Sequence, residues 1–239
     1  VSLEGLAVTG GDYGIHIYNR SSNCRVLGCR SYANASSGIR VQSSYDTRIE
    51  QTVVAYNSGE GIHLAYDPDA SCEAFLTSNT ICLNDEAQVD LSSGWSMDLR
   101  NNIIWAATSG HYCLDFESGL GDVGYSDYND LYATDGALIG NKNGVSATLA
   151  EWQVATGQDT NSISADPLYV DADGVDDVPG TSDDDFHLQS TAGSWHDGLW
   201  SVDGSDSPCI DVGTPEAGWS AEPLPNGGLI NQGAYGGTA

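Results

Sequence analysis

Apolar and polar residues alternate in short segments that recur along the first half of the chain. The clearest copies begin with Gly-Ile and cover residues 14–18, 38–42 and 61–65, and looser copies follow at residues 88–92 and 113–117. Strict alternation is the period of a β-strand that has one face in a core and the other in water. Each copy therefore predicts one short strand.

The central polar position of each copy recurs at nearly constant spacing. These positions are His16, Arg40, His63, Asp90 and Asp115, and the steps between them are 24, 23, 27 and 25 residues. Self-similarity at this period is typical of stacked repeats. The sequence therefore predicts an all-β solenoid in which each coil adds one strand to a parallel sheet.

A second set of positions keeps the same register. Apolar residues at 26, 49, 76 and 99 are each followed three positions later by a smaller or polar residue, namely Cys29, Thr52, Asn79 and Asn102. Such positions would stack about 4.8 Å apart along the solenoid. Buried Asn79 and Asn102 would then hydrogen-bond along an internal ladder. The alternative is that these polar residues lie in turns.

Several motifs in the second half carry a resemblance to a known group. They are Asp-Pro-Leu-Tyr at 166–169, Asp-Phe-His-Leu at 185–188, Ser-Pro-Cys-Ile-Asp-Val-Gly at 207–213 and Gly-Ala-Tyr-Gly-Gly at 233–237. Together with the repeats, they resemble the right-handed parallel β-helix proteins of the pectate-lyase-like type, many of them large secreted bacterial proteins. The resemblance implies a right-handed parallel β-helix and an extracellular or cell-surface location. It is weaker for activity, because this group includes lyases, hydrolases and proteins without catalysis.

We expect one domain with three parts: parallel β-helix coils over residues 1–135, a loop and a short covering helix over 136–165, and an acidic loop with a capping segment over 166–239. The helix is predicted at 148–156, since Thr148 and Glu151 form a capping box and Gly157 offers a stop. Trp152 is its expected anchor on the coils. In the last part, Phe186, Leu188, Cys209 and Ile210 predict two short strands that close the open end of the core.

Composition excludes some partners. The chain has 7 Lys and Arg against 34 Asp and Glu, a formal net charge of −27, which would repel nucleic acid and anionic membranes. No apolar run is long enough for a membrane span. The six cysteines permit up to three disulfides in an oxidising compartment, or they are core thiols.

An acidic loop at residues 171–185 suggests a cation. Aspartates at this density repel one another, and a hard cation with oxygen ligands would relieve that repulsion. We therefore predict that Ca²⁺ binds here, although the spacing departs from the EF-hand pattern. The candidate ligands are Asp171, Asp173, Asp176, Asp177 and Asp183. The alternative is a solvated acidic loop.

The outward column of the main sheet is the candidate catalytic site. In a β-elimination on a uronate, Arg40 would bind the substrate carboxylate, and neutral His63 or His16 would take the adjacent proton. Asp90 and Asp115 would orient His63 or hold a cation, and as a pair they also permit hydrolysis. The candidate substrate-binding residues, two positions further along each strand, are Tyr18, Gln42 and Glu117. The alternative is that these polar residues only keep the sheet soluble.

Two functions of different class remain open. The first is a secreted β-helix that binds or acts on polysaccharide, with a uronate lyase assisted by Ca²⁺ as its catalytic form. The second is a non-catalytic structural, adhesive or filament-forming β-helix. The second is favoured by the N-terminal edge of the predicted sheet, which could accept another subunit through an unpaired parallel strand.

Overall fold

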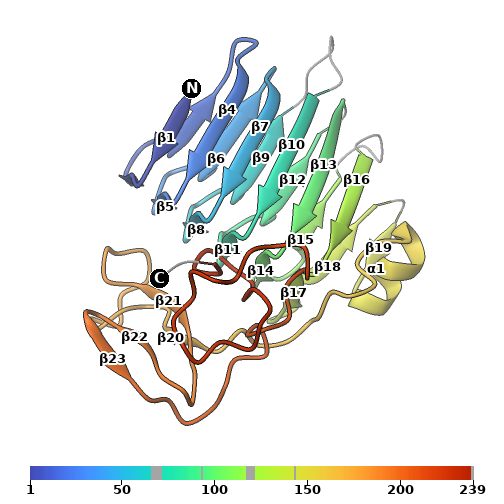
Figure 1. The fold of residues 1–239 in the computed structure, drawn as a ribbon. Coiled ribbons are helices and arrows are strands. Elements are labelled where there is room, and N and C mark those ends of the chain that lie inside the picture. Colours follow the sequence, from blue (N-terminus) through green and yellow to red (C-terminus); the bar gives the residue numbers. More distant parts are fainter. Residues whose placement is uncertain (66–71, 93, 117–121, 143, 238–239) are drawn as a thin grey trace.

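The chain folds into a parallel β-helix whose coils each contribute one strand to three sheets. The computed structural model describes residues 1–65, 72–92, 94–116, 122–142 and 144–237. Figure 1 shows the coils stacked from the N-terminal end (blue) to the short helix α1 (yellow), with the C-terminal region (orange and red) along one side. Parallel pairing of strands from successive coils runs through all three sheets.

The strands of each sheet are short and follow one another coil by coil. Sheet A contains β1 (Ser2–Glu4), β4 (Ser22–Leu27), β7 (Tyr45–Glu50), β10 (Cys72–Thr77), β13 (Trp95–Arg100) and β16 (Asp122–Asp127). Sheet B contains β2 (Ala7–Val8), β5 (Arg30–Tyr32), β8 (Val53–Ala55), β11 (Thr80–Cys82), β14 (Ile103–Ala106) and β17 (Asp130–Ala133). Sheet C contains β3 (Ile15–Ile17), β6 (Ile39–Gln42), β9 (Ile62–Ala65), β12 (Val89–Leu91), β15 (Tyr112–Asp115) and β18 (Leu138–Asn141), followed by antiparallel β19 (Val145–Ser146).

The parallel coils predicted from the repeats are confirmed, and they extend past residue 135. β18 pairs in parallel with β15, so the last coil ends near residue 141. The inward side chains of the three sheets form one continuous core, to which Val26, Ile49, Leu76 and Leu99 contribute as stacked neighbours. In the described parts of the chain, no helix has the length and apolarity needed to cross a membrane.

The predicted polar ladder lies at the corner between sheets A and B. Asn79 and Asn102 are fully buried. Asn79 donates to Asn102 Oδ1 from both its backbone N and its Nδ2, each at 3.0 Å, and Asn102 donates to Asn129 Oδ1 in the same way. Toward the N-terminus, Thr52 N donates to Asn79 Oδ1. Each amide thus provides the hydrogen bonds that the corner of the chain loses when it leaves one sheet for the next.

A second ladder, which we did not predict, lies at the corner between sheets B and C. It runs through Asn34, Asn57 and Asn84 to Gln88. Each asparagine donates from N and Nδ2 to the side-chain oxygen of the next residue at 2.8–3.1 Å. Gly38 and Gly61 precede the strands of sheet C because a Cβ at either position would meet these amides at 2.6–2.7 Å. The Gly-Ile motif therefore makes room for the ladder.

The predicted helix is confirmed as α1 (Leu149–Thr156). Thr148 and Glu151 form the capping box, and Gly157 ends the helix in the left-handed conformation. Trp152 is fully buried in the main core, packs against Phe116 and donates from Nε1 to Asp159 Oδ2 at 2.8 Å. The helix lies at the C-terminal end of the stack (Figure 1). It therefore covers the end of the core.

The expectation that the C-terminal segment closes the open end of the core is wrong. This segment packs on the outer face of sheet B, where Phe186 and Cys209 join Val53, Ala55 and Cys82 in a second apolar cluster. Its strands are β20 (Tyr169–Asp171), β21 (Asp185–Leu188), β22 (Ser194–His196) and β23 (Leu199–Ser201), and Cys209 and Ile210 lie in a turn. The physical reason is that the outer face of sheet B is itself apolar and requires a cover.

The six cysteines are buried thiols and do not form disulfides. One of them contacts a buried carboxyl group between sheet B and the C-terminal segment. Cys209 Sγ donates to Asp130 Oδ2 at 3.3 Å, and Ala165 N donates to Asp130 Oδ1 at 3.0 Å. Burial raises the pKa of Asp130 to about 7, more than these two hydrogen bonds lower it.

We predict that Asn102→Ala lowers the free energy of unfolding by about 3 kcal/mol, because it leaves buried partners above and below without hydrogen bonds. Urea unfolding measures this change. Asn226→Ala is the matched control, since within the described residues the Asn226 amide donates only to Glu222 O, at 3.3 Å. A loss of stability no larger than that of the control would show that the ladder does not hold the coils together.

We also predict a pH-dependent stability that depends on Asp130. Its pKa in the folded protein lies above its ordinary value, so the folded state favours the protonated carboxyl. This contribution is complete below about pH 4 and is lost as the pH rises through about 7, by up to about 4 kcal/mol. Asp130→Asn should therefore stabilise the protein at pH 8 and not at pH 4 in denaturant titrations. Parallel stability curves for the two proteins would contradict the assignment.

Candidate functional site

The outward side chains of sheet C form the column predicted from the repeats. The register pairs His16 with Arg40, Arg40 with His63, His63 with Asp90 and Asp90 with Asp115. The neighbouring side chains on each strand point inward into the core. All five predicted residues therefore lie in one row, and Asn141 on β18 extends it beyond Asp115.

The centre of the row is a compact polar cluster. Arg40 Nη1 lies 2.9 Å from His63 Nδ1, and His63 Nε2 lies 3.6 Å from Asp90 Oδ2. Glu60, from the turn before β9, places Oε1 3.5 Å from His63 Nδ1, and its Oε2 accepts from Ser37 Oγ at 2.6 Å. The imidazole is thus held between one cation and two carboxylates.

The contacts of Arg40 determine the tautomer of His63. A guanidinium group only donates hydrogen bonds, so His63 Nδ1 must accept from it. The imidazole in this arrangement is therefore neutral and carries its proton on Nε2, toward Asp90. The lone pair of Nδ1 is engaged with Arg40.

An aromatic group lies at the N-terminal end of the row. His16 packs between Tyr13 and Tyr18, with ring centroids 5.2 and 4.9 Å away. The Arg40 guanidinium lies 5.3 Å from the Tyr13 ring. Burial and, to a smaller extent, the positive charge of Arg40 lower the pKa of His16. His16 is therefore held toward its neutral form.

The other end of the row is an amide–carboxylate pair. Asn141 Nδ2 donates to Asp115 Oδ1 at 2.9 Å. Asp115 remains partly exposed, whereas Asp90 is only 4% exposed. The row thus changes from exposed aromatic and basic groups to more buried acidic ones.

The predicted substrate-binding residues differ in position. Tyr18 is 59% exposed beyond the end of β3, and Gln42 is partly exposed on β6. The position beside Gln42 on the next strand is Ala65, which is buried, so the second polar column does not continue there. Glu117 lies outside the described residues.

The acidic loop does not gather its aspartates into one group. Among the described residues, the group of three or more possible ligands with atoms within 4.8 Å of one another is Glu60, His63 and Asp90. Asp173, Asp176 and Asp177 are exposed. Asp183 lies against Gly174, and a hydrogen bond from Thr181 lowers its pKa. Calcium binding by Asp171, Asp173, Asp176, Asp177 and Asp183 stays a prediction.

The cluster around His63 does not fit a cation in this arrangement. A metal ion held by Glu60, His63 and Asp90 would need one ligand atom from each residue. The lone pair that His63 would offer from Nδ1 already accepts a hydrogen bond from the Arg40 guanidinium. Ca²⁺ also prefers oxygen ligands alone. We therefore assign no metal-dependent step to this cluster.

Sequence reasoning missed Glu60, Tyr13 and Asn141 as parts of the site. Glu60 and Tyr13 lie in the corners just before β9 and β3, where the repeat pattern predicts only turns. Asn141 lies on β18, a strand that does not begin with the Gly-Ile motif. Its position, 26 residues after Asp115, was the available signal.

The fold and the outward row define the protein as a parallel β-helix repeat protein with a polar, partly buried cluster on one sheet. A sequence model of the family described as disaggregatase related matches residues 12–213, so the chain belongs to the disaggregatase-related family. No curated protein and no solved structure matches the chain.

We predict that Arg40→Gln raises the pKa of His16, because it removes the neighbouring positive charge. The pKa stays below its ordinary value, since burial is the larger cause of the shift. NMR titration of the His16 ring protons measures the change, and Arg48→Gln on sheet A is the control. An unchanged titration in Arg40→Gln would contradict the stacked geometry.

Proposed function

We propose that this protein cleaves an acidic polysaccharide by β-elimination on the outward face of sheet C. The observation that carries the proposal is the Arg40–His63–Asp90 arrangement, in which one imidazole lies between a guanidinium and a carboxylate. A uronate offers the two groups that this cluster is suited to meet: a carboxylate for Arg40 and an acidic C–H beside that carboxylate.

Substrate binding would release the base. A carboxylate accepts two parallel hydrogen bonds from a guanidinium, which is stronger than one bond to a neutral imidazole. Arg40 would therefore give up its hydrogen bond to His63 Nδ1 and bind the substrate carboxylate instead. The freed lone pair of Nδ1 then faces the substrate, and Nε2–H remains directed at Asp90.

The elimination follows from these positions. His63 Nδ1 takes the proton from C5, and Arg40 stabilises the negative charge that develops on the carboxylate. The electron pair of the C5–H bond forms the C4–C5 double bond as the C4–O4 bond breaks, and water protonates the departing O4. Asp90 stabilises the imidazolium formed on His63 and returns His63 to its starting tautomer once the proton is lost.

The rest of the row suits an extended chain. Strands repeat about 4.8 Å apart, so the row crosses the coils from the His16 end to the Asp115 end. Tyr18 is exposed beside His16 and offers a flat ring on which a sugar can stack. We assign Tyr18 and Gln42 to substrate binding and place the activity outside the cell or at its surface.

The family description supports a role of this kind. A disaggregatase is by its name an activity that breaks up aggregates, and cutting a polysaccharide that joins particles or cells would do so. We also propose that the acidic loop binds Ca²⁺. The ion takes no part in the elimination itself, and the assay is therefore run with and without it.

The test is the ultraviolet absorbance of the unsaturated product on a panel of polyuronates, with and without Ca²⁺. The wild type should produce it. Arg40→Ala and His63→Ala should each lose about a hundredfold or more in rate, and Arg40→Lys should lose less than Arg40→Ala, because the charge remains but the two-pronged geometry is lost.

Arg48→Ala is the matched control, because Arg48 is an exposed cation on sheet A that contacts Phe75 and Asp46. It should leave the rate unchanged. No product from any polyuronate, or product that persists in Arg40→Ala, would reject the lyase.

Binding without cleavage is the second candidate, in which the protein acts as an adhesive or filament-forming surface. The observation that favours it is that both ring nitrogens of His63 already have polar neighbours. The first strands β1, β2 and β3 each have one partner strand within the described residues, and a second copy could pair with them. Self-association in sedimentation, together with polyuronate binding and no product, would select this candidate.

A further inference from the structure

A cavity of about 550 Å³ lies in the C-terminal region, away from the sheet C row. Its floor includes Thr80 and Ile103 on the outer face of sheet B. Its walls come from β21, the β22–β23 hairpin and residues 222–236. Cavities of this size are typical of sites for small ligands. None of the residues proposed for the elimination lines it.

Two buried side chains lining the cavity keep an oxygen without a donor. Glu222 is 6% exposed; its Oε1 accepts from Asn231 N and Gly237 N, and its Oε2 has no hydrogen-bond partner among the described residues. Gln232 is 1% exposed; its Nε2 donates to Tyr128 O, and its Oε1 likewise has no partner in the described part of the chain. A buried acceptor without a donor is costly. Both oxygen atoms are closed to solvent, so a ligand's hydrogen-bond donor would reach either one after a side-chain shift that opens it to the cavity.

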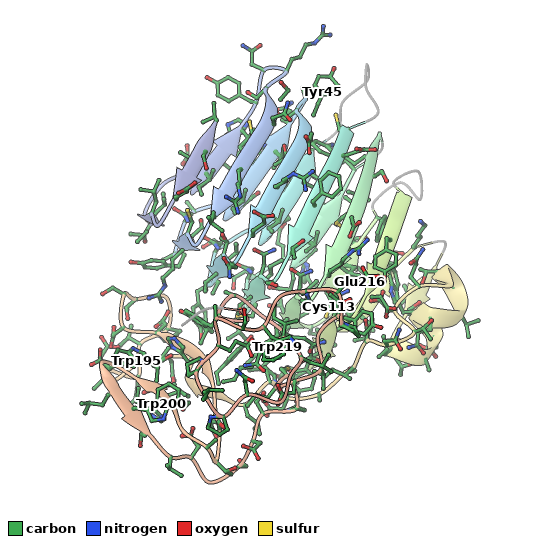
Figure 2. All side chains as sticks on the ribbon, in the orientation of Figure 1. Tyr45, Cys113, Trp195, Trp200, Glu216 and Trp219 are labelled. Atoms are coloured by element: carbon green, nitrogen blue, oxygen red, sulfur yellow. The ribbon has the colours of Figure 1, made fainter. Side chains whose placement is uncertain are left out.

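Aromatic rings line the same cavity. Trp195 and Trp200 pair across the β22–β23 hairpin and are 44% and 52% exposed. His187 and Tyr235 stack with their centroids 3.8 Å apart. Figure 2 shows Trp195 and Trp200 together on the hairpin, apart from Trp219. Exposed flat rings in a cavity that polar residues also line suit a ligand with an apolar face and hydroxyl groups on its edge.

The charge of the walls selects among such ligands. None of the described residues that line the cavity is Lys or Arg, whereas Glu222 and Asp211 are both acidic. A phosphate or a uronate would meet negative charge and no fixed cation. An uncharged sugar ring would not be repelled by these acidic groups, and a ring with an ammonium group would be attracted to them.

We propose that this cavity binds one or two sugar rings that carry no negative charge. The rings stack on Trp200 or Trp195, and a shift of the Glu222 or Gln232 side chain opens its buried oxygen to their hydroxyl or ammonium groups. This second site differs from the sheet C row in the charge of its ligand, and its binding does not depend on the proposed elimination. Together the two sites would let one chain hold a glycan at one position while a uronate lies at another.

The test uses saturation-transfer NMR and tryptophan fluorescence with the methyl glycosides of glucose, galactose and mannose, with glucosamine, and with glucuronate as the anionic comparison. At least one neutral or amino sugar should bind, and glucuronate should bind at least tenfold more weakly. Trp200→Ala should weaken binding about tenfold or more, and Glu222→Gln should weaken glucosamine more than the methyl glycosides.

Trp219→Ala is the matched control, because Trp219 is an exposed tryptophan of the same region that does not line the cavity. It should leave binding unchanged. If Trp200→Ala does not fold, as judged by its thermal melt, Glu222→Gln carries the test. No binding of any neutral or amino sugar, equal binding of glucuronate, or equal effects of Trp200→Ala and Trp219→Ala would each overturn the proposal.

Discussion

Side-chain amides stacked along two corners of the solenoid hold this structure in register. A parallel β-helix must bend its chain three times per coil, and each bend removes backbone groups from the sheets. Here Asn79, Asn102 and Asn129 at one corner, and Asn34, Asn57 and Asn84 at the other, provide the missing hydrogen bonds from coil to coil. Since the amides of Asn34, Asn57, Asn79 and Asn102 each bind the equivalent asparagine in the next coil, a shift of one residue would break both ladders.

The fixed register has a chemical consequence on sheet C. Residues separated by more than twenty positions along the chain become neighbours, so that Arg40, His63 and Asp90 meet on adjacent strands. The imidazole then has a donor on one ring nitrogen and a carboxylate near the other. The scaffold thereby sets the tautomer of His63, and an acceptor that competes for Arg40 would change what Nδ1 can do.

The sequence predicted the coils, the outward row and the helix because each follows from local rules. Alternation predicts a strand face, a constant step predicts stacking, and Thr148 with Glu151 predicts a helix start. The packing of the C-terminal segment was predicted wrongly, since the apolar outer face of sheet B is recognised only once Val53 and Cys82 are known to point away from the core. The place of Glu60 in the site and the cavity beside Glu222 could not be predicted. Both are formed by contacts between corners and loops, and the repeat spacing carries no information about these contacts.

The most direct test of this account is the protonation state of His63 in the folded protein, measured by long-range proton–nitrogen correlation NMR on isotope-labelled histidine. The account predicts a neutral ring with its proton on Nε2, and a change in the Nδ1 resonance when an oligouronate is added and Arg40 leaves the ring. A proton on Nδ1, or no response of Nδ1 to an oligouronate that binds, would contradict it.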